Sequence, residues 1–443
     1  MRRPRPSRLA RPGHVPARVT TPLRLLTVLL ALAPACKDRK AAVPPSAGPE
    51  ISGENTDPDS AAPGDVEVPE LEADAPTKER AKRPPPAPVT SLGAAVDAIG
   101  HGNPEGAAAF LKDALKKAPA DEPLRLTLAH ALATTGAHDE AEALLSQKPV
   151  KGKAGNPRLR MHARLRLLRG DPAGAEKLLD QAIAQNPDDL AARGELLALR
   201  VSTGRGNEPG TRALMDALYD AYDAGKASTA EELVAVARAA LARGSSGAFH
   251  DANMVLGEAE KLPTPTTGPE QGFVVQDRVL LLRGAVFREK YAASEAADTY
   301  NVILARDAWQ PDALAGLALT QLELLRLAGA SESAEAALQT NPRHPEAHGV
   351  LARVALVEGR RDEAVNRARS QILTIHPRHP IGLAVLAAAA LSSDDDAAFK
   401  KPRDEALAFS PTAIPFYLAL NDVLVSMHLY EQTETVLAEA VKR

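Results

Sequence analysis

One pentapeptide occurs twice in the C-terminal half of this 443-residue chain, as Asn341-Pro342-Arg343-His344-Pro345 and as His376-Pro377-Arg378-His379-Pro380. The copies lie 35 residues apart, and Val350-Leu351-Ala352 recurs at the same offset as Val385-Leu386-Ala387. A fixed period of this size is typical of solenoids, in which each short unit buries its apolar face against the next unit. The repeated stretch therefore predicts a solenoid rather than a set of globular domains.

The same period continues toward the N-terminus, where Gly136 and Gly170 are 34 residues apart. Within one unit, Leu124, Leu128 and Leu132 recur at helical spacing and form one apolar face. Gly136 then suits the left-handed end of a helix, and a second amphipathic segment follows it. Each unit thus predicts a helix, a short turn and a second helix, so the expected fold class is all-α.

These units resemble the tetratricopeptide repeat (TPR) family in their period and in the placing of small and large residues. Gly284, Phe287, Ala296 and Tyr300 match the family pattern in one unit, as do Ala352, Gly359, Ala364 and Pro377, and Gly170, Ala175, Ala182 and Pro187, in two others. The resemblance covers most of residues 91–443. It implies a TPR-like helical-hairpin solenoid of about ten helix pairs.

The solenoid is expected in two blocks. The first covers 91–262 and becomes irregular from residue 188, and the second covers 272–443. Of the residues between the two blocks, 263–269 are rich in proline and threonine. In the irregular part, helices are expected at 189–203, 208–224, 227–243 and 247–262.

The first 35 residues have the layout of an export signal. Seven arginines and no acid precede the apolar stretch Leu25–Ala33, which is too short to cross a bilayer as a helix. Ala33 and Ala35 fit ordinary signal peptidase cleavage, which would leave a soluble periplasmic or secreted protein. The stretch 32–36 also resembles a bacterial lipobox, and this alternative is favoured because Cys36, the residue that would carry the lipid, is the only cysteine.

A linker is expected at 36–90, starting at the lipidated Cys36. Residues 37–90 contain eleven prolines and no aromatic residue, and nine carboxylates lie between Glu50 and Asp74. Such a composition cannot bury enough apolar area to offset the entropy of ordering the chain. The prediction is a disordered tether between a membrane and the solenoid. Lys37 after Cys36, by analogy with lipoprotein sorting in some Gram-negative bacteria, favours the outer membrane, facing the periplasm.

Motifs for catalysis and cofactor binding are missing from the sequence. It contains neither a GxxxxGK[ST] phosphate loop nor an HExxH zinc motif. His344-Pro345-Glu346-Ala347-His348 has two histidines at helical spacing, but its glutamate is misplaced for the common zinc-protease motifs. A single cysteine excludes disulfide frameworks, and a net charge of −4 argues against nucleic-acid binding. The expectation is a protein without catalytic residues, metal, cofactor or small-molecule substrate.

In TPR arrays the first helix of each pair lines the concave face. Registering the units on their glycines places six cationic side chains on that face: His130, Arg160, Arg164, Arg278, Arg288 and Arg353. Arginine pairs well with carboxylates, so these residues are candidate contacts for a protein or peptide partner, for example an acidic one. The competing interpretation is that they are ordinary solvated helix positions.

The leading functional hypothesis is a non-catalytic interaction scaffold or adaptor of the bacterial cell envelope, held at the membrane by a lipid. An alternative is a repeat module of, or a partner to, an envelope metallopeptidase whose catalytic domain is absent from this chain, because the later units look like arrays that precede such domains. A third hypothesis, binding of peptidoglycan or another polysaccharide, is disfavoured by the low aromatic content of 3%.

Overall fold

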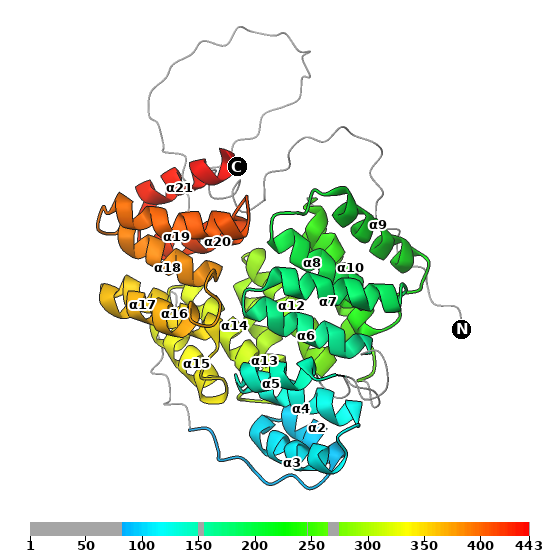
Figure 1. Ribbon diagram of the computed structural model, residues 1–443. Coiled ribbons are helices and arrows are strands. Elements are labelled where there is room, and N and C mark those ends of the chain that lie inside the picture. The colour runs from blue at the N-terminus through cyan, green and yellow to red at the C-terminus, as the bar shows by residue number, and fades with distance from the viewer. Residues whose placement is uncertain (1–81, 149–154, 246, 265–273, 443) are drawn as a thin grey trace, which may run out of the picture.

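The computed structural model describes residues 82–148, 155–245, 247–264 and 274–442 (Figure 1). These residues form twenty α-helices and a short π-helical segment, and no strand occurs among them. The all-α fold class and the ten helix pairs are thereby confirmed. The predicted signal peptide, Cys36 and the linker up to residue 81 lie outside the described residues.

Consecutive helices pair into ten hairpins. The first five are α2 (Leu92–Gly100) with α3 (Pro104–Lys117), α4 (Glu122–Thr134) with α5 (His138–Ser146), α6 (Asn156–Leu168) with α7 (Pro172–Gln185), α8 (Leu190–Ser202) with α9 (Pro209–Asp223), and α10 (Ala230–Arg243) with α11 (Ala248–Glu260). The other five are α12 (Val274–Glu289) with α13 (Ala293–Leu304), α14 (Pro311–Glu323) with α15 (Leu327–Thr340), α16 (Pro345–Val357) with α17 (Arg361–Arg367) and its π-helical continuation η1 (Ala368–Ile372), α18 (Pro380–Leu391) with α19 (Asp396–Phe409), and α20 (Ile414–Ser426) with α21 (Tyr430–Lys442).

The helix ends follow from local sequence. At the start of α4, Asp121 Oδ1 accepts a hydrogen bond from Leu124 N at 3.0 Å, and at the start of α7 Asp171 Oδ1 accepts one from Gly174 N at 2.8 Å. A proline occupies the first turn of both helices, where its missing N–H leaves no hydrogen bond unmade. Asp189 and Asp395 cap α8 and α19 in the same way, so local sequence sets the start of several of the helices.

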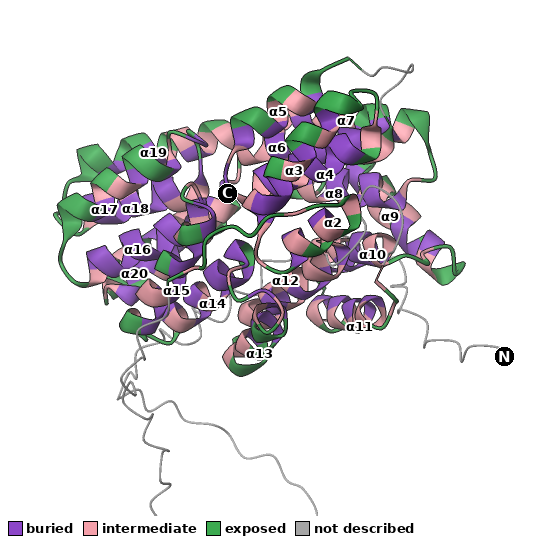
Figure 2. Cartoon of the chain, turned by 90° about the horizontal axis from the view of Figure 1, so that it is seen from below, coloured by how far each residue is buried: buried purple, intermediate pink, exposed green. Residues whose placement is uncertain are grey.

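Small residues allow the helices to pack closely. The ring of Tyr300 on α13 lies between Gly284 of α12 and Gly316 of α14, and a Cβ on either glycine would come within 2.6 Å of the ring. The first helix of each hairpin also contacts the first helix of the next, from α2 through α20. The first helices therefore form a continuous inner layer. Buried residues face the neighbouring helices, and exposed ones lie on the outer surfaces (Figure 2).

The stacking of hairpins continues through the part of the chain where the sequence period is lost. The four helices expected there correspond to α8, α9, α10 and α11. Gly194 of α8 packs directly on Ala235 of α10, whose Cα would lie 2.6 Å from a Cβ at position 194. The residue pattern has diverged here while the architecture has been kept. Residues 265–271, most of the proposed boundary between the blocks, lie outside the described residues.

The second half of the solenoid packs against the first half (Figure 1). Four turn glycines within the first four hairpins each face a polar residue that links two later hairpins. We call these contacts the seam: Gly102 with Asp307, Gly136 with Asn341, Gly170 with His376, and Gly204 with Ser410. All four glycines have positive φ angles between 75° and 80°.

Hydrogen bonds and close packing hold the seam together. Arg306 Nε donates to Gly100 O at 3.0 Å, and Arg343 donates to Asp139 Oδ2 at 3.0 Å. A Cβ on Gly102, Gly170 or Gly204 would lie within 2.8 Å of the facing side chain. The first hairpin thus meets the link between the sixth and seventh, so about six hairpins complete one turn of the superhelix.

Residues 82–90 precede the first helix and have no regular secondary structure, yet they are attached to both halves. The guanidinium of Arg83 pairs with Glu105 of α3 and donates to Gly102 O at 2.9 Å. Its backbone N–H donates to Gln339 Oε1 of α15 at 3.0 Å. The last residues of the expected linker therefore lie on the solenoid (Figure 1).

Candidate functional site

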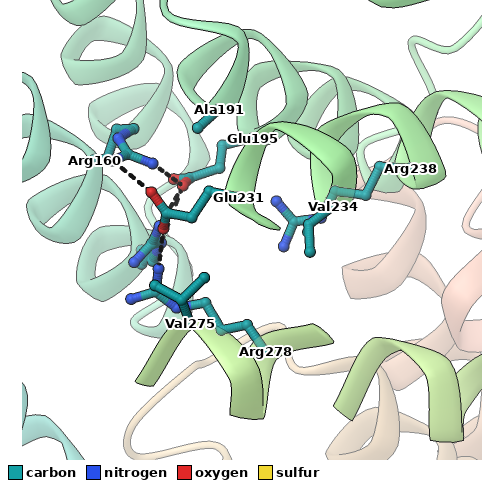
Figure 3. Close-up of a pocket in the computed structure, with 9 residues that line it drawn as sticks. Arg160, Ala191, Glu195, Glu231, Val234, Arg238, Val275 and Arg278 are labelled. Carbon is teal, nitrogen blue, oxygen red and sulfur yellow. Dashed lines mark hydrogen bonds and ion pairs between the residues drawn. The ribbon is translucent and has the colours of Figure 1, made fainter. Parts of the chain in front are cut away.

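Charged side chains gather on the inner faces of four consecutive first helices. Arg160 and Arg164 come from α6, Glu195 from α8, Glu231 and Arg238 from α10, and Arg278 from α12 (Figure 3). We call these six residues the arginine–glutamate cluster. They converge because first helices of adjacent hairpins lie in contact along the inner layer.

The two glutamates hold three of the arginines in place. Arg160, which is 6% exposed, lies 2.9 Å from Glu231 Oε2 and 3.7 Å from Glu195 Oε1, with Asp189 at 3.8 Å. Arg164 lies 2.5 Å from Glu195 Oε1 and 3.6 Å from Glu231 Oε1. Arg278 also pairs with Glu231. Each carboxylate is thus shared by at least two guanidinium groups.

Arg238 differs from the other arginines. Its side chain extends toward the cluster (Figure 3), but within the described part of the chain its guanidinium makes no ion pair or hydrogen bond. Burial lowers the pKa of Arg238, and the positive charges of Arg164 and Arg278 act in the same direction, whereas Glu195 and Glu231 oppose them. With four arginines and two glutamates, the cluster carries an excess of positive charge.

The space among these side chains is small. The cavity measures about 10 Å³ and is also lined by Ala191, Val234 and Val275. A cavity of this size holds about one water molecule. It can accept a single charged group at its edge, such as a carboxylate, but it is too small to enclose a ligand.

The other three predicted cations lie elsewhere. Arg288 pairs with Glu323 Oε1 at 2.8 Å, between the sixth and seventh hairpins. Arg353 is 6% exposed and donates to Asp422 O and Ser426 Oγ, both at 3.2 Å, which ties α16 to α20. His130 is half-buried on α4. The structure therefore brings Arg160, Arg164 and Arg278 together and separates them from His130, Arg288 and Arg353.

Three residues of the cluster were not predicted from the sequence: Arg238, Glu195 and Glu231. All three lie between residues 188 and 271, where the repeat period is lost and the register of the first helices could not be carried forward. The expected helices at 189–203 and 227–243 did contain a pattern that could have indicated them. The alanines and leucines of each helix define an apolar face, and that face would have placed these charges beside it.

The two histidines of the 344–348 segment have structural partners. His344 Nδ1 accepts from Ala347 N at 3.3 Å at the start of α16, and its Nε2 lies 3.1 Å from Asp312 Oδ1. His348 Nε2 lies 2.9 Å from Pro342 O. Across the described residues, no three histidine, cysteine, aspartate or glutamate side chains converge as metal ligands would. None of the helices described is both long and apolar enough to span a membrane.

The fold places this chain among the helical-hairpin repeat proteins. Residues 98–162, from the end of α2 into α6, match the family model of the tetratricopeptide repeat. No curated protein matches the sequence significantly. The remaining hairpins continue the architecture of the matched segment, so the chain is a TPR-like α-solenoid, a class of fold that generally binds protein partners.

Solved structures with similar backbones include three repeat proteins of low sequence identity. A chain of the APC/C hetero-tetramer Cut9–Hcn1 is 15% identical with a TM-score of 0.49, over 80% of this chain and 63% of that one. A tetratricopeptide repeat protein from Parabacteroides merdae is 15% identical (TM-score 0.33, 65% and 92% of the two chains), and human IFIT1 is 13% identical (TM-score 0.45, 80% and 89%). The present chain thus spans about two thirds of the Cut9–Hcn1 chain and most of the other two.

Proposed function

We propose that this protein is a non-catalytic interaction scaffold whose arginine–glutamate cluster binds a carboxylate of a partner polypeptide. The observation that carries the proposal is Arg238, a guanidinium on the inner layer without an ion pair in the described chain, within a cluster of four arginines and two glutamates. A partly buried cation without a counter-ion is costly, and a ligand carboxylate relieves that cost.

The geometry of the cluster suits a carboxylate better than a larger anion. Glu195 and Glu231 already orient Arg160, Arg164 and Arg278, so little side-chain entropy is lost when a ligand arrives. The planar forks of Arg238 and Arg278 offer paired N–H donors, which match the two oxygens of a carboxylate. The small cavity admits the charged group while the rest of the partner lies along the inner helices.

The test is recovery of partners from detergent-solubilised cell envelopes on the immobilised protein. Arg238→Glu and Arg278→Glu should each lower the recovery of specific partners by about tenfold or more, because each places an extra negative charge where a carboxylate binds. Arg361→Glu, on the exposed start of α17, is the matched control and should recover partners normally. Equal recovery by all three variants would reject the cluster as the binding site.

We further propose that the protein belongs to the bacterial cell envelope and is anchored through a lipid on Cys36, in the outer membrane facing the periplasm. Support comes from the arginine-rich leader, its short apolar stretch, and the position of the only cysteine. More than one acyl chain would be needed for stable attachment. Mass spectrometry of the purified N-terminal peptide should find a diacylglyceryl group on Cys36, and an unmodified Cys36 would favour the soluble periplasmic or secreted alternative.

A further inference from the structure

A second, larger cavity lies within the seam, between the contacts Gly170–His376 and Gly204–Ser410. It has a volume of about 390 Å³, within the range of pockets that bind small molecules or single large side chains. One wall comes from the ends of α6 and α8. The other comes from the end of α19, the links before α18 and α20, and the first turns of α16, α18 and α20. The cavity exists because two turns of the superhelix meet, so no single hairpin could form it.

The interior of this cavity is mainly apolar. Leu167 and Leu168 come from the first turn of the superhelix, and Pro380, Phe409 and Phe416 from the second. The Phe409 ring packs edge-on to His376, with 5.5 Å between the ring centroids. Burial lowers the pKa of His376 to about 4, so this ring is uncharged at neutral pH and adds to the apolar surface.

Two of the three charged groups around the cavity are positive. Arg164 and Arg378 line it, and Glu346 is the one carboxylate in this lining. The Glu346 carboxylate faces two histidines: Oε2 lies 3.3 Å from His344 Nδ1, and Oε1 lies 3.8 Å from His379 Nε2. Arg378 is exposed, and its guanidinium has no ion pair with any described residue. An apolar cavity with an unpaired guanidinium beside it complements an apolar group that carries a carboxylate.

The cavity lies next to the arginine–glutamate cluster, because the two share a lining residue. Arg164 lines both sites, contacting Glu195 on the inner layer and the apolar cavity beside it. A polypeptide that places one carboxylate on Arg238 could therefore extend past Arg164 and reach the cavity. This adjacency favours a polypeptide over a free fatty acid, since a fatty acid would use the cavity alone.

We propose that the seam cavity binds a large apolar side chain of the partner polypeptide, with a neighbouring acidic residue pairing with Arg378. This inference rests on the proposed function, because it assumes that the partner is a polypeptide lying on the inner helices. It adds a specificity-determining subsite, which selects partners with an aromatic or large aliphatic residue next to an acid.

The cavity itself is tested with anilinonaphthalene sulfonate, a fluorescent probe that joins an apolar ring system to an anion. The full chain should bind it at one site. Ser202→Phe and Ala406→Leu fill the cavity from opposite walls, and each should weaken binding about tenfold or more. Arg378→Glu should weaken binding of the anionic probe several-fold but leave binding of its uncharged analogue N-phenylnaphthylamine unchanged. If both cavity-filling variants bind the probe as the wild type does, the proposed site is overturned. Equal effects of Arg378→Glu on binding of the two dyes would overturn it as well.

The occupant is tested by selecting peptides from a random phage-displayed library on the wild-type chain. The expected peptides pair a large apolar residue with Asp or Glu, compete with the dye, and bind the Ser202→Phe variant about tenfold more weakly or worse. No enrichment, enrichment without such pairs, or displacement of the dye by laurate but not by the peptides would each overturn the polypeptide subsite. Because dye binding should persist in Arg238→Glu, failure of the cluster and failure of the cavity are distinguishable.

Discussion

Gly170 and His376 are 206 positions apart in the sequence, yet a Cβ on Gly170 would lie 2.7 Å from the Nδ1 atom of His376. Gly170 has a φ angle of +75° and ends the turn between α6 and α7. His376 Nδ1 accepts a hydrogen bond from Arg378 N at 3.1 Å and so shapes its own turn. The seam therefore joins two turns, each of which is first formed by local sequence.

Replacing Gly170 by alanine should destabilise the protein more than the same change at an open glycine. Gly359 is the matched control, because its φ angle is +78° and nothing lies within 4 Å of a Cβ built there. Gly359→Ala should cost about 1–2 kcal/mol for the left-handed conformation, and Gly170→Ala about 1–3 kcal/mol more for the clash with His376. Denaturant unfolding measures both, and equal losses would mean that the seam yields without strain.

The histidine of this contact should make stability depend on pH. Burial lowers the pKa of His376 to about 4, and the charge of His379 acts in the same direction. Below pH 6.5, His376 takes up a proton in the unfolded chain but not in the folded one. The contribution of His376 to the free energy of unfolding therefore falls by up to about 1.4 kcal/mol for each pH unit between pH 6.5 and pH 4. Above pH 6.5 both states are neutral and the contribution is constant.

His376→Asn isolates that effect, because Asn341 occupies the equivalent position in the preceding contact and accepts from Arg343 N at 3.0 Å. The free energy of unfolding, measured from pH 7 to pH 4, should decline less steeply in this variant than in the wild type. His250→Asn, at an exposed position on α11, should leave the slope unchanged. A His376→Asn variant with the wild-type slope would contradict the assignment.

Two arginines of the cluster should respond oppositely to neutralisation. Arg160→Met leaves Glu195 and Glu231 with fewer partners and should cost about 3 kcal/mol. Arg238→Met removes a partly buried cation that has no ion pair in the described chain. The free energy of unfolding of this variant should therefore equal or exceed that of the wild type. Chemical unfolding of both variants provides the measurement. A comparable loss in Arg238→Met would show that Arg238 is stabilising and would weaken the case for a ligand site.

The segment 82–90 should detach from the solenoid when its arginine is removed. Arg83 pairs with Glu105 and donates a hydrogen bond to Gly102 O, whereas Lys82 is exposed and makes no such contact with the part of the chain that the structure describes. In Arg83→Ala, amide hydrogen exchange and proteolysis within 82–90 should increase about tenfold or more, and Lys82→Ala should match the wild type. Unchanged exchange in Arg83→Ala would indicate that the rest of the segment suffices for attachment.

Much of the architecture could be predicted because the determining contacts are local. The spacing of Leu124, Leu128 and Leu132 predicted a helical face, and these residues are buried in α4. Helices expected at 189–203 and 227–243 are observed at 190–202 and 230–243. The candidate site was predicted only in part. Arg160, Arg164 and Arg278 converge, but Arg238, which has no ion pair among the described residues, comes from a hairpin whose repeat pattern has diverged.

The sequence by itself determined the helices, their caps and the stacking of each hairpin on the next, because these depend on residues within about one repeat of each other. The tertiary structure alone decided that Gly170 meets His376, that a cavity forms between Leu168 and Phe416, and that three predicted arginines share two glutamates. Those contacts depend on the number of hairpins in one superhelical turn. That number is set by the small rotation between successive hairpins, which accumulates along the array. A repeat period carries no direct record of this rotation.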